Sequence, residues 1–227
     1  MEKVISRDVL AANPNRRLLV CGAAAGPLYI ALGVFQMLIR PGYDPTRHDL
    51  SLMSNGHLGW IQITNFVLSG FLVIAGALGM RRVLAGSRGG TWGPFLVGVY
   101  GLGLIGAGIF VADPALGFPP GTPADAHEIS VHGLMHFVTG GIGFLALIAA
   151  CFVFARRFRA LKESRWAVYS IITGIVFCAA FFGIATGSQL GGDVLVFVTL
   201  AFTVAVVNTW AWLSAICLRL AGETPGG

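Results

Sequence analysis

Charge is scarce in this sequence. Only 11% of the 227 residues are Asp, Glu, Lys or Arg, whereas a soluble domain carries about 25%. A chain that is 56% hydrophobic cannot cover its apolar side chains with so few charges. The shortage of charge therefore excludes an ordinary soluble domain and favours a polytopic membrane protein.

Long polar stretches are missing as well. Apolar runs divide the chain, and each is long enough to cross a bilayer, which takes about 20 residues. We expect six membrane-spanning helices, at residues 18–39, 58–80, 91–112, 132–155, 166–186 and 194–218. The intervening loops are too short for a soluble domain, so residues 1–227 are expected to form a single all-α membrane domain, a bundle of six transmembrane helices.

Lys and Arg are nearly absent from one side of this expected bundle. Thirteen of the 15 lie in the N-terminus, in the loops after the second and fourth helices, or in the tail. Only Arg40 and Arg47 lie on the other side. Because positively charged loops stay in the cytoplasm, we expect a multi-pass plasma-membrane protein with both termini cytoplasmic. The same asymmetry explains the net charge of +5 without a nucleic-acid partner.

Several kinds of site lack their residues. None of the four cysteines lies in an expected outer loop, so no extracytoplasmic disulfide framework is indicated. The glycine cluster of residues 98–108 lies inside an apolar run, where helix packing explains it better than phosphate binding. Acidic residues are absent from the middle of the runs, so a small-solute transporter ranks third among the functions considered. Amides lie in or beside the runs at Gln36, Asn65, Gln189 and Asn208.

The outer side is rich in residues that can carry chemistry. All five histidines and six of the ten acidic residues map there. We therefore expect a polar outer cap built from the loops after the first and third helices. The candidates are His48, Asp49 and Ser51 in the first outer loop, and Asp113, Glu128 and His132 in or after the second.

His132 and His136 are four residues apart at the start of the fourth run. On a helix, both imidazoles face the same way and can bind one metal ion, as in the H-E-x-x-H motif of zinc enzymes. No glutamate lies between them here, and a third ligand would have to come from His48, His127, Asp49 or Asp113, of which we favour His48 or Asp113. A water held on such a zinc ion has a pKa near 7 and can attack an ester or amide.

The other candidates have a place in that chemistry. Asp49 or Glu128 would act as the general base, and Ser51 would assist the metal-bound water or the oxyanion. The alternative is that the same side chains form a hydrogen-bonded network that closes the outer end of the bundle.

Two functions from different classes follow from these alternatives. In the first, the protein has a binding, sensing or scaffold role, and its outer cap is structural or holds a ligand. In the second, it is a membrane-embedded metal-dependent hydrolase that acts on a lipid or amphiphile. Stoichiometric bound metal would favour the second function.

Three short motifs on the outer side are His48-x-x-Ser51, Phe110-x-x-Asp113-Pro114 and His132. Their order and placement resemble the bacterial and archaeal membrane family called domain of unknown function 998. The resemblance runs from about the first helix to the sixth and implies a six-helix integral membrane protein with no established activity. It points to the named His, Ser and Asp positions, whereas His136 is not part of the family's pattern.

The outer residues are also distantly similar to membrane hydrolases of the alkaline-ceramidase type. That resemblance implies a zinc ion held inside the bundle, with Ser, Asp and His side chains around it. This chain departs from the type because it has six expected helices instead of seven. Its histidine pair also opens the fourth helix, where that type has histidines in its last helix.

Overall fold

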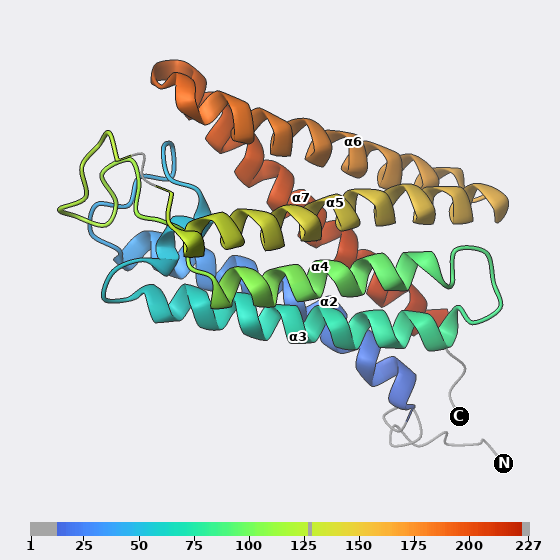
Figure 1. Ribbon diagram of the computed structural model, residues 1–227. Coiled ribbons are helices and arrows are strands. Elements are labelled where there is room, and N and C mark those ends of the chain that lie inside the picture. The colour runs from blue at the N-terminus through green and yellow to red at the C-terminus, as the bar shows by residue number, and fades with distance from the viewer. Residues whose placement is uncertain (1–12, 127–128, 224–227) are drawn as a thin grey trace, which may run out of the picture.

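The computed structural model describes residues 13–126 and 129–223. Six long helices make up most of the described chain (Figure 1), and two short 3-10 helices, η1 and η2, lie between them. The helices are α2 (Pro14–Ile39), η1 (Leu50–Ser54), α3 (Gly59–Val83), α4 (Trp92–Ile109), α5 (Val131–Ala160), α6 (Ser164–Gly187), η2 (Ser188–Leu190) and α7 (Gly192–Glu223). The six long helices are long and apolar enough to cross a membrane. No strand occurs within the described residues, which confirms the predicted all-α bundle.

Several helices end at other residues than the sequence predicted. Helices α3 and α5 continue to Val83 and Ala160, because arginines in the last turn of a helix interact favourably with its C-terminal dipole. Helix α4 is shorter than predicted and ends at Ile109. The backbone of Phe110 is extended there, and the chain turns toward the start of α5.

The helices form a closed ring. Each helix packs against its neighbours in the sequence, and α7 returns to pack against α2. One end of the ring carries the arginines in the last turns of α3 and α5 and the short loops that follow these helices, and we call it the basic end (Figure 1). The other end, the cap end, carries the first cap loop (residues 40–58) and the described part of the second cap loop (residues 110–126 and 129–130). The α6–α7 hairpin extends away from both cap loops at this end.

Glycines determine how closely several helices approach. A Cβ atom on Gly22 of α2 would lie 2.7 Å from the Cα atom of Gly76 in α3. Likewise, a Cβ atom on Gly103 of α4 would lie 2.8 Å from the Cα atom of Gly143 in α5. Such contacts between small residues let helix backbones pack directly in a membrane.

Aromatic rings connect all six helices inside the bundle. Successive ring centroids lie 6.0, 5.0, 5.5, 6.4 and 5.2 Å apart along one path. The path runs through Phe66 (α3), Tyr29 (α2), Trp210 (α7), Tyr100 (α4), Phe144 (α5) and Phe177 (α6). Each such contact stabilises the fold by about 0.5–1.5 kcal/mol beyond the burial of its area. The five contacts together therefore stabilise the closed arrangement of the six helices.

Candidate functional site

The first cap loop begins with a turn around Asp44. The Oδ1 atom of Asp44 accepts hydrogen bonds from the hydroxyl of Thr46 at 2.7 Å and from its backbone N–H at 2.9 Å. These bonds stabilise the carboxylate and lower the pKa of Asp44 below its ordinary value. The backbone carbonyl of Asp44 accepts the N–H of His48 at 2.8 Å, so the turn places this histidine.

Asp49 and Ser51 bond to each other. The Oδ1 atom of Asp49 accepts the Ser51 hydroxyl at 2.6 Å, the Ser51 N–H at 3.0 Å and the Leu52 N–H at 3.1 Å. This is the arrangement of an N-cap, and it starts η1. The two residues that the sequence suggested as a base and a water partner are thus together, and both are used to hold the loop.

His48 joins the two cap loops. Its Nδ1 atom accepts the backbone N–H of Asp44 at 2.9 Å, because an N–H can only donate. In the neutral ring the proton is therefore on Nε2, which donates to the carbonyl of Leu116 in the second cap loop at 3.1 Å. The ring packs against Phe118, with centroids 5.4 Å apart. Both ring nitrogens of His48 therefore have a hydrogen-bond partner, and one face of the ring contacts Phe118.

Arg40 makes the second connection between the cap loops. It lies at the end of α2, and burial lowers its pKa. Its Nη1 atom donates to the carbonyl of Met53 at 3.0 Å, and Nη2 donates to the carbonyl of Asn55. The guanidinium carbon lies 5.2 Å from the ring centroid of Phe118, a cation–π distance. Phe118 is fully buried and is the residue on which both loops close.

Asp113 holds the start of α5. Its Oδ2 atom accepts the backbone N–H of Ser130 at 2.8 Å, and Oδ1 accepts the Ser130 hydroxyl at 2.5 Å. The Ser130 hydroxyl oxygen in turn accepts the N–H of Gly133 at 3.0 Å and caps the helix. A side chain at Gly133 would overlap the Asp113 carboxylate, so a larger residue here would displace that carboxylate.

His132 and His136 have different surroundings although they lie on the same helix. His136 is buried, and its Nδ1 atom lies 2.8 Å from the carbonyl of Phe110 and 3.1 Å from that of Ala107. Carbonyls only accept, so Nδ1 carries the proton and Nε2 holds the lone pair of the neutral ring. His132 is exposed, with its ring centroid 5.9 Å from that of Phe110.

The four predicted metal ligands have separate contacts. His48 bonds to the second cap loop, Asp113 bonds to Ser130, and only the histidine pair shares a helix face. Within residues 13–126 and 129–223, no group of three His, Cys, Asp or Glu side chains is placed to hold a metal ion. His127 and Glu128 lie outside the described residues, and the metal site stays a prediction.

Below the cap, a set of buried polar side chains lies between α2 and α3. We call it the amide row, and its members are Tyr29, Gln36, Gln62, Asn65 and Ser69. The Nε2 atom of Gln36 donates to Oε1 of Gln62 at 2.7 Å. Asn65 donates to the same oxygen at 3.3 Å and to the carbonyl of Tyr29 at 3.1 Å. The Ser69 hydroxyl donates to Oδ1 of Asn65 at 3.3 Å and ends the row.

Two polar atoms in and beside the row have no hydrogen-bond partner among the described residues. These atoms are Oε1 of Gln36 and Nε1 of Trp210, and both are buried. Trp210 packs on Tyr29, with ring centroids 5.0 Å apart, and the Tyr29 hydroxyl lies 3.5 Å from Nε2 of Gln62. Within the described chain, the row thus has one unpaired hydrogen-bond acceptor, Oε1 of Gln36, and beside the row lies one unpaired donor, Nε1 of Trp210.

Sequence reasoning found only part of this site. It named Gln36 and Asn65 but omitted Gln62, although Gln62, Asn65 and Ser69 are spaced as one face of a helix. The roles of Arg40 and Phe118 had no local signal, because their partners are distant in the sequence.

A family model matches most of the chain. The family model described as "Protein of unknown function (DUF998)" matches residues 23–219. The chain belongs to this family. The match includes both cap loops and the whole amide row of this DUF998 protein, and it confirms the resemblance seen in the sequence motifs. No curated protein and no solved structure matches the chain.

Proposed function

We propose that this DUF998 protein is a membrane-embedded binding protein that holds a small polar molecule at the amide row. The observation that carries the proposal is the carboxamide of Gln36. Its side chain is 0% exposed, yet its oxygen has no donor among the described residues. A ligand with an N–H or O–H group would complete it.

The orientation of the Gln36 amide supports the proposal. Its nitrogen donates to the carbonyl of Leu32 at 3.2 Å as well as to Gln62. Exchanging the two ends of the amide would place its oxygen against the Leu32 carbonyl, so the oxygen keeps its unpaired position. An unpaired buried acceptor costs about 1–3 kcal/mol, and a bound donor would recover that free energy.

The first cap loop begins one helical turn after Gln36. The backbone N–H of Arg40 donates to the carbonyl of Gln36 at 3.0 Å, so the two residues are one helical turn apart. Arg40 in turn holds the first cap loop and contacts Phe118 of the second. We infer that the cap closes the amide row toward the aqueous side and that a ligand enters when the two loops separate.

The test compares Gln36→Leu with Gln189→Leu, which removes an exposed amide at the same end of the bundle. Each protein is purified in detergent and denatured, and the released small molecules are identified by mass spectrometry. We expect a polar compound that is released by the wild type and by Gln189→Leu but is lost from Gln36→Leu. Identical profiles for all three proteins would contradict the proposal.

A metal-dependent hydrolase is the second candidate function, and His136 favours it. Two backbone carbonyls orient its Nδ1–H, which leaves Nε2 with a lone pair, as in histidines that ligate metals. His132 would add a second ligand, with His48 or Asp113 as the third. Such a site would act on a lipid or amphiphile.

The metal content of the purified protein, measured by elemental mass spectrometry, tests this second candidate. Near one zinc ion per chain in the wild type, lost in His132→Ala/His136→Ala, would establish a metal site. Asp49, Ser51 and Glu128 would then be tested as the base and its partner. Absence of metal from both proteins would leave the histidines as parts of the cap.

A further inference from the structure

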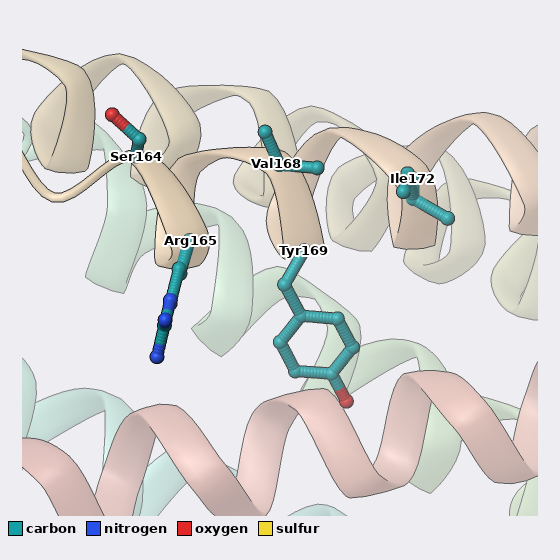
Figure 2. Close-up of a pocket in the computed structure, with 5 residues that line it drawn as sticks. All are labelled: Ser164, Arg165, Val168, Tyr169 and Ile172. Atoms are coloured by element: carbon teal, nitrogen blue, oxygen red, sulfur yellow. The ribbon is translucent and has the colours of Figure 1, made fainter.

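A shallow groove lies on α6 near the basic end. It is lined by Ser164, Arg165, Val168, Tyr169 and Ile172. Figure 2 shows Arg165 and Tyr169 projecting from α6 in the same direction, toward the side on which α7 runs. Val168 lies between them along the helix and points elsewhere. The groove itself is lined by apolar side-chain atoms, and the charged head of Arg165 lies at its edge.

The charge of Arg165 is not neutralised by the described part of the protein. Its side chain is exposed and has no hydrogen-bond or ion-pair partner among the described residues. The nearest carboxylate in the sequence, that of Glu163, is occupied by Arg219 at 2.7 Å. Arg219 also pairs with Glu223 at 3.0 Å. Arg165 is thus left as a free cation at the edge of the membrane-spanning part of α6.

The apolar wall continues from this cation toward the middle of the membrane. Val168 and Ile172 are 51% and 53% exposed, and Ile175 follows on α6 at 55%. Residues spaced by three or four positions form one stripe along a helix. A stripe of exposed branched side chains that begins at a cation matches an acyl chain below an anionic headgroup.

We propose that this groove binds one anionic phospholipid. The phosphate of the headgroup lies at Arg165, at the edge of the groove, and an acyl chain lies along Val168 and Ile172. With the basic end in the cytoplasm, the lipid comes from the cytoplasmic leaflet, where anionic lipids concentrate and attract basic side chains. The site is separate from the amide row and does not depend on it.

The experiment is native mass spectrometry of the full chain in detergent, titrated with dioleoyl phosphatidylglycerol or with dioleoyl phosphatidylcholine. The variants are Arg165→Gln, Tyr169→Phe and, as a control, Arg156→Gln, which removes another exposed arginine near the same end. We expect one phosphatidylglycerol to bind more tightly than phosphatidylcholine. Arg165→Gln should weaken it about fivefold, the ratio that corresponds to about 1 kcal/mol for one cation near a membrane surface.

Each outcome decides the proposal. Selective loss in Arg165→Gln, with Arg156→Gln and Tyr169→Phe unchanged, supports the groove. Equal weakening by Arg165→Gln and Arg156→Gln would show attraction to the whole basic end and overturn it. Equal binding of the two lipids by the wild type would show ordinary annular lipid and would also overturn it.

Discussion

At the scale of single residues, the polar side chains of the cap are bonded mainly to one another and to the backbone. Asp49 holds Ser51, His48 holds the carbonyl of Leu116, and Asp113 holds Ser130. Groups with their hydrogen bonds filled in this way hold a structure rather than react. Below the cap, Gln36 differs from these side chains, because its oxygen is buried and unpaired within the described chain.

The first prediction at this scale concerns Arg40. Arg40→Lys keeps the charge but loses the planar fork that reaches two carbonyls and lies on Phe118. We expect a decrease in the free energy of unfolding of about 1–3 kcal/mol, measured by thermal unfolding in detergent. Arg47→Lys is the control, because Arg47 is exposed in the same loop. Equal stability of the two variants would refute the role of Arg40.

The second residue-scale prediction concerns pH. The pKa of Asp44 is lowered by the Thr46 hydrogen bonds, so the folded state holds its proton less tightly than the unfolded state does. The stabilisation is complete above the ordinary Asp pKa of about 3.9 and is lost as the pH falls through the lowered value. Thr46→Val removes the hydroxyl, so this variant should lose less stability than the wild type on acidification from about pH 5 to 3. Parallel curves would contradict the assignment.

At the scale of elements, the start of α5 is fixed by its contact with the end of α4. The Asp113 carboxylate and Gly133 occupy adjoining space, and each position depends on the other. Shortening of α4 relative to its predicted end allows this contact, because the chain between Ile109 and Asp113 leaves the helix.

A double-mutant cycle tests this dependence. Gly133→Ala should displace Asp113, and Asp113→Ala should remove the support of the cap, each costing about 1–2 kcal/mol of stability. The double variant should cost no more than Asp113→Ala alone, because the added methyl group then fills the space of the missing carboxylate. Chemical unfolding in mixed micelles gives the three values, and simple additivity would rule out the proposed contact.

The sequence was most informative about elements and least informative about their contacts. All six spanning helices follow from the lengths of the apolar runs. The meeting of Arg40 and His48 with residues 116–118 does not follow, because loop partners across more than sixty positions leave no periodic pattern. Gln62 could have been found from its spacing to Asn65, but its bond to Gln36 required the packing of α2 on α3.

At the scale of the whole molecule, the basic end is expected to be cytoplasmic, in one membrane domain that spans residues 1–227. The prediction rests on the distribution of Lys and Arg. Single cysteines at Pro45 in the first cap loop and Ala85 beside α3, in a background without the native cysteines, report the orientation. In intact cells, a membrane-impermeant maleimide should label Pro45→Cys and leave Ala85→Cys unlabelled. The reverse pattern would invert the topology.

The central claim is that the amide row of this DUF998 protein holds a polar ligand. An experimental density map of the full chain, purified from its native membrane, tests that claim most directly. We predict density larger than a water molecule within about 3 Å of the Gln36 Oε1 atom, the distance of a hydrogen bond. Density for a single water, or none, at that oxygen would contradict the claim.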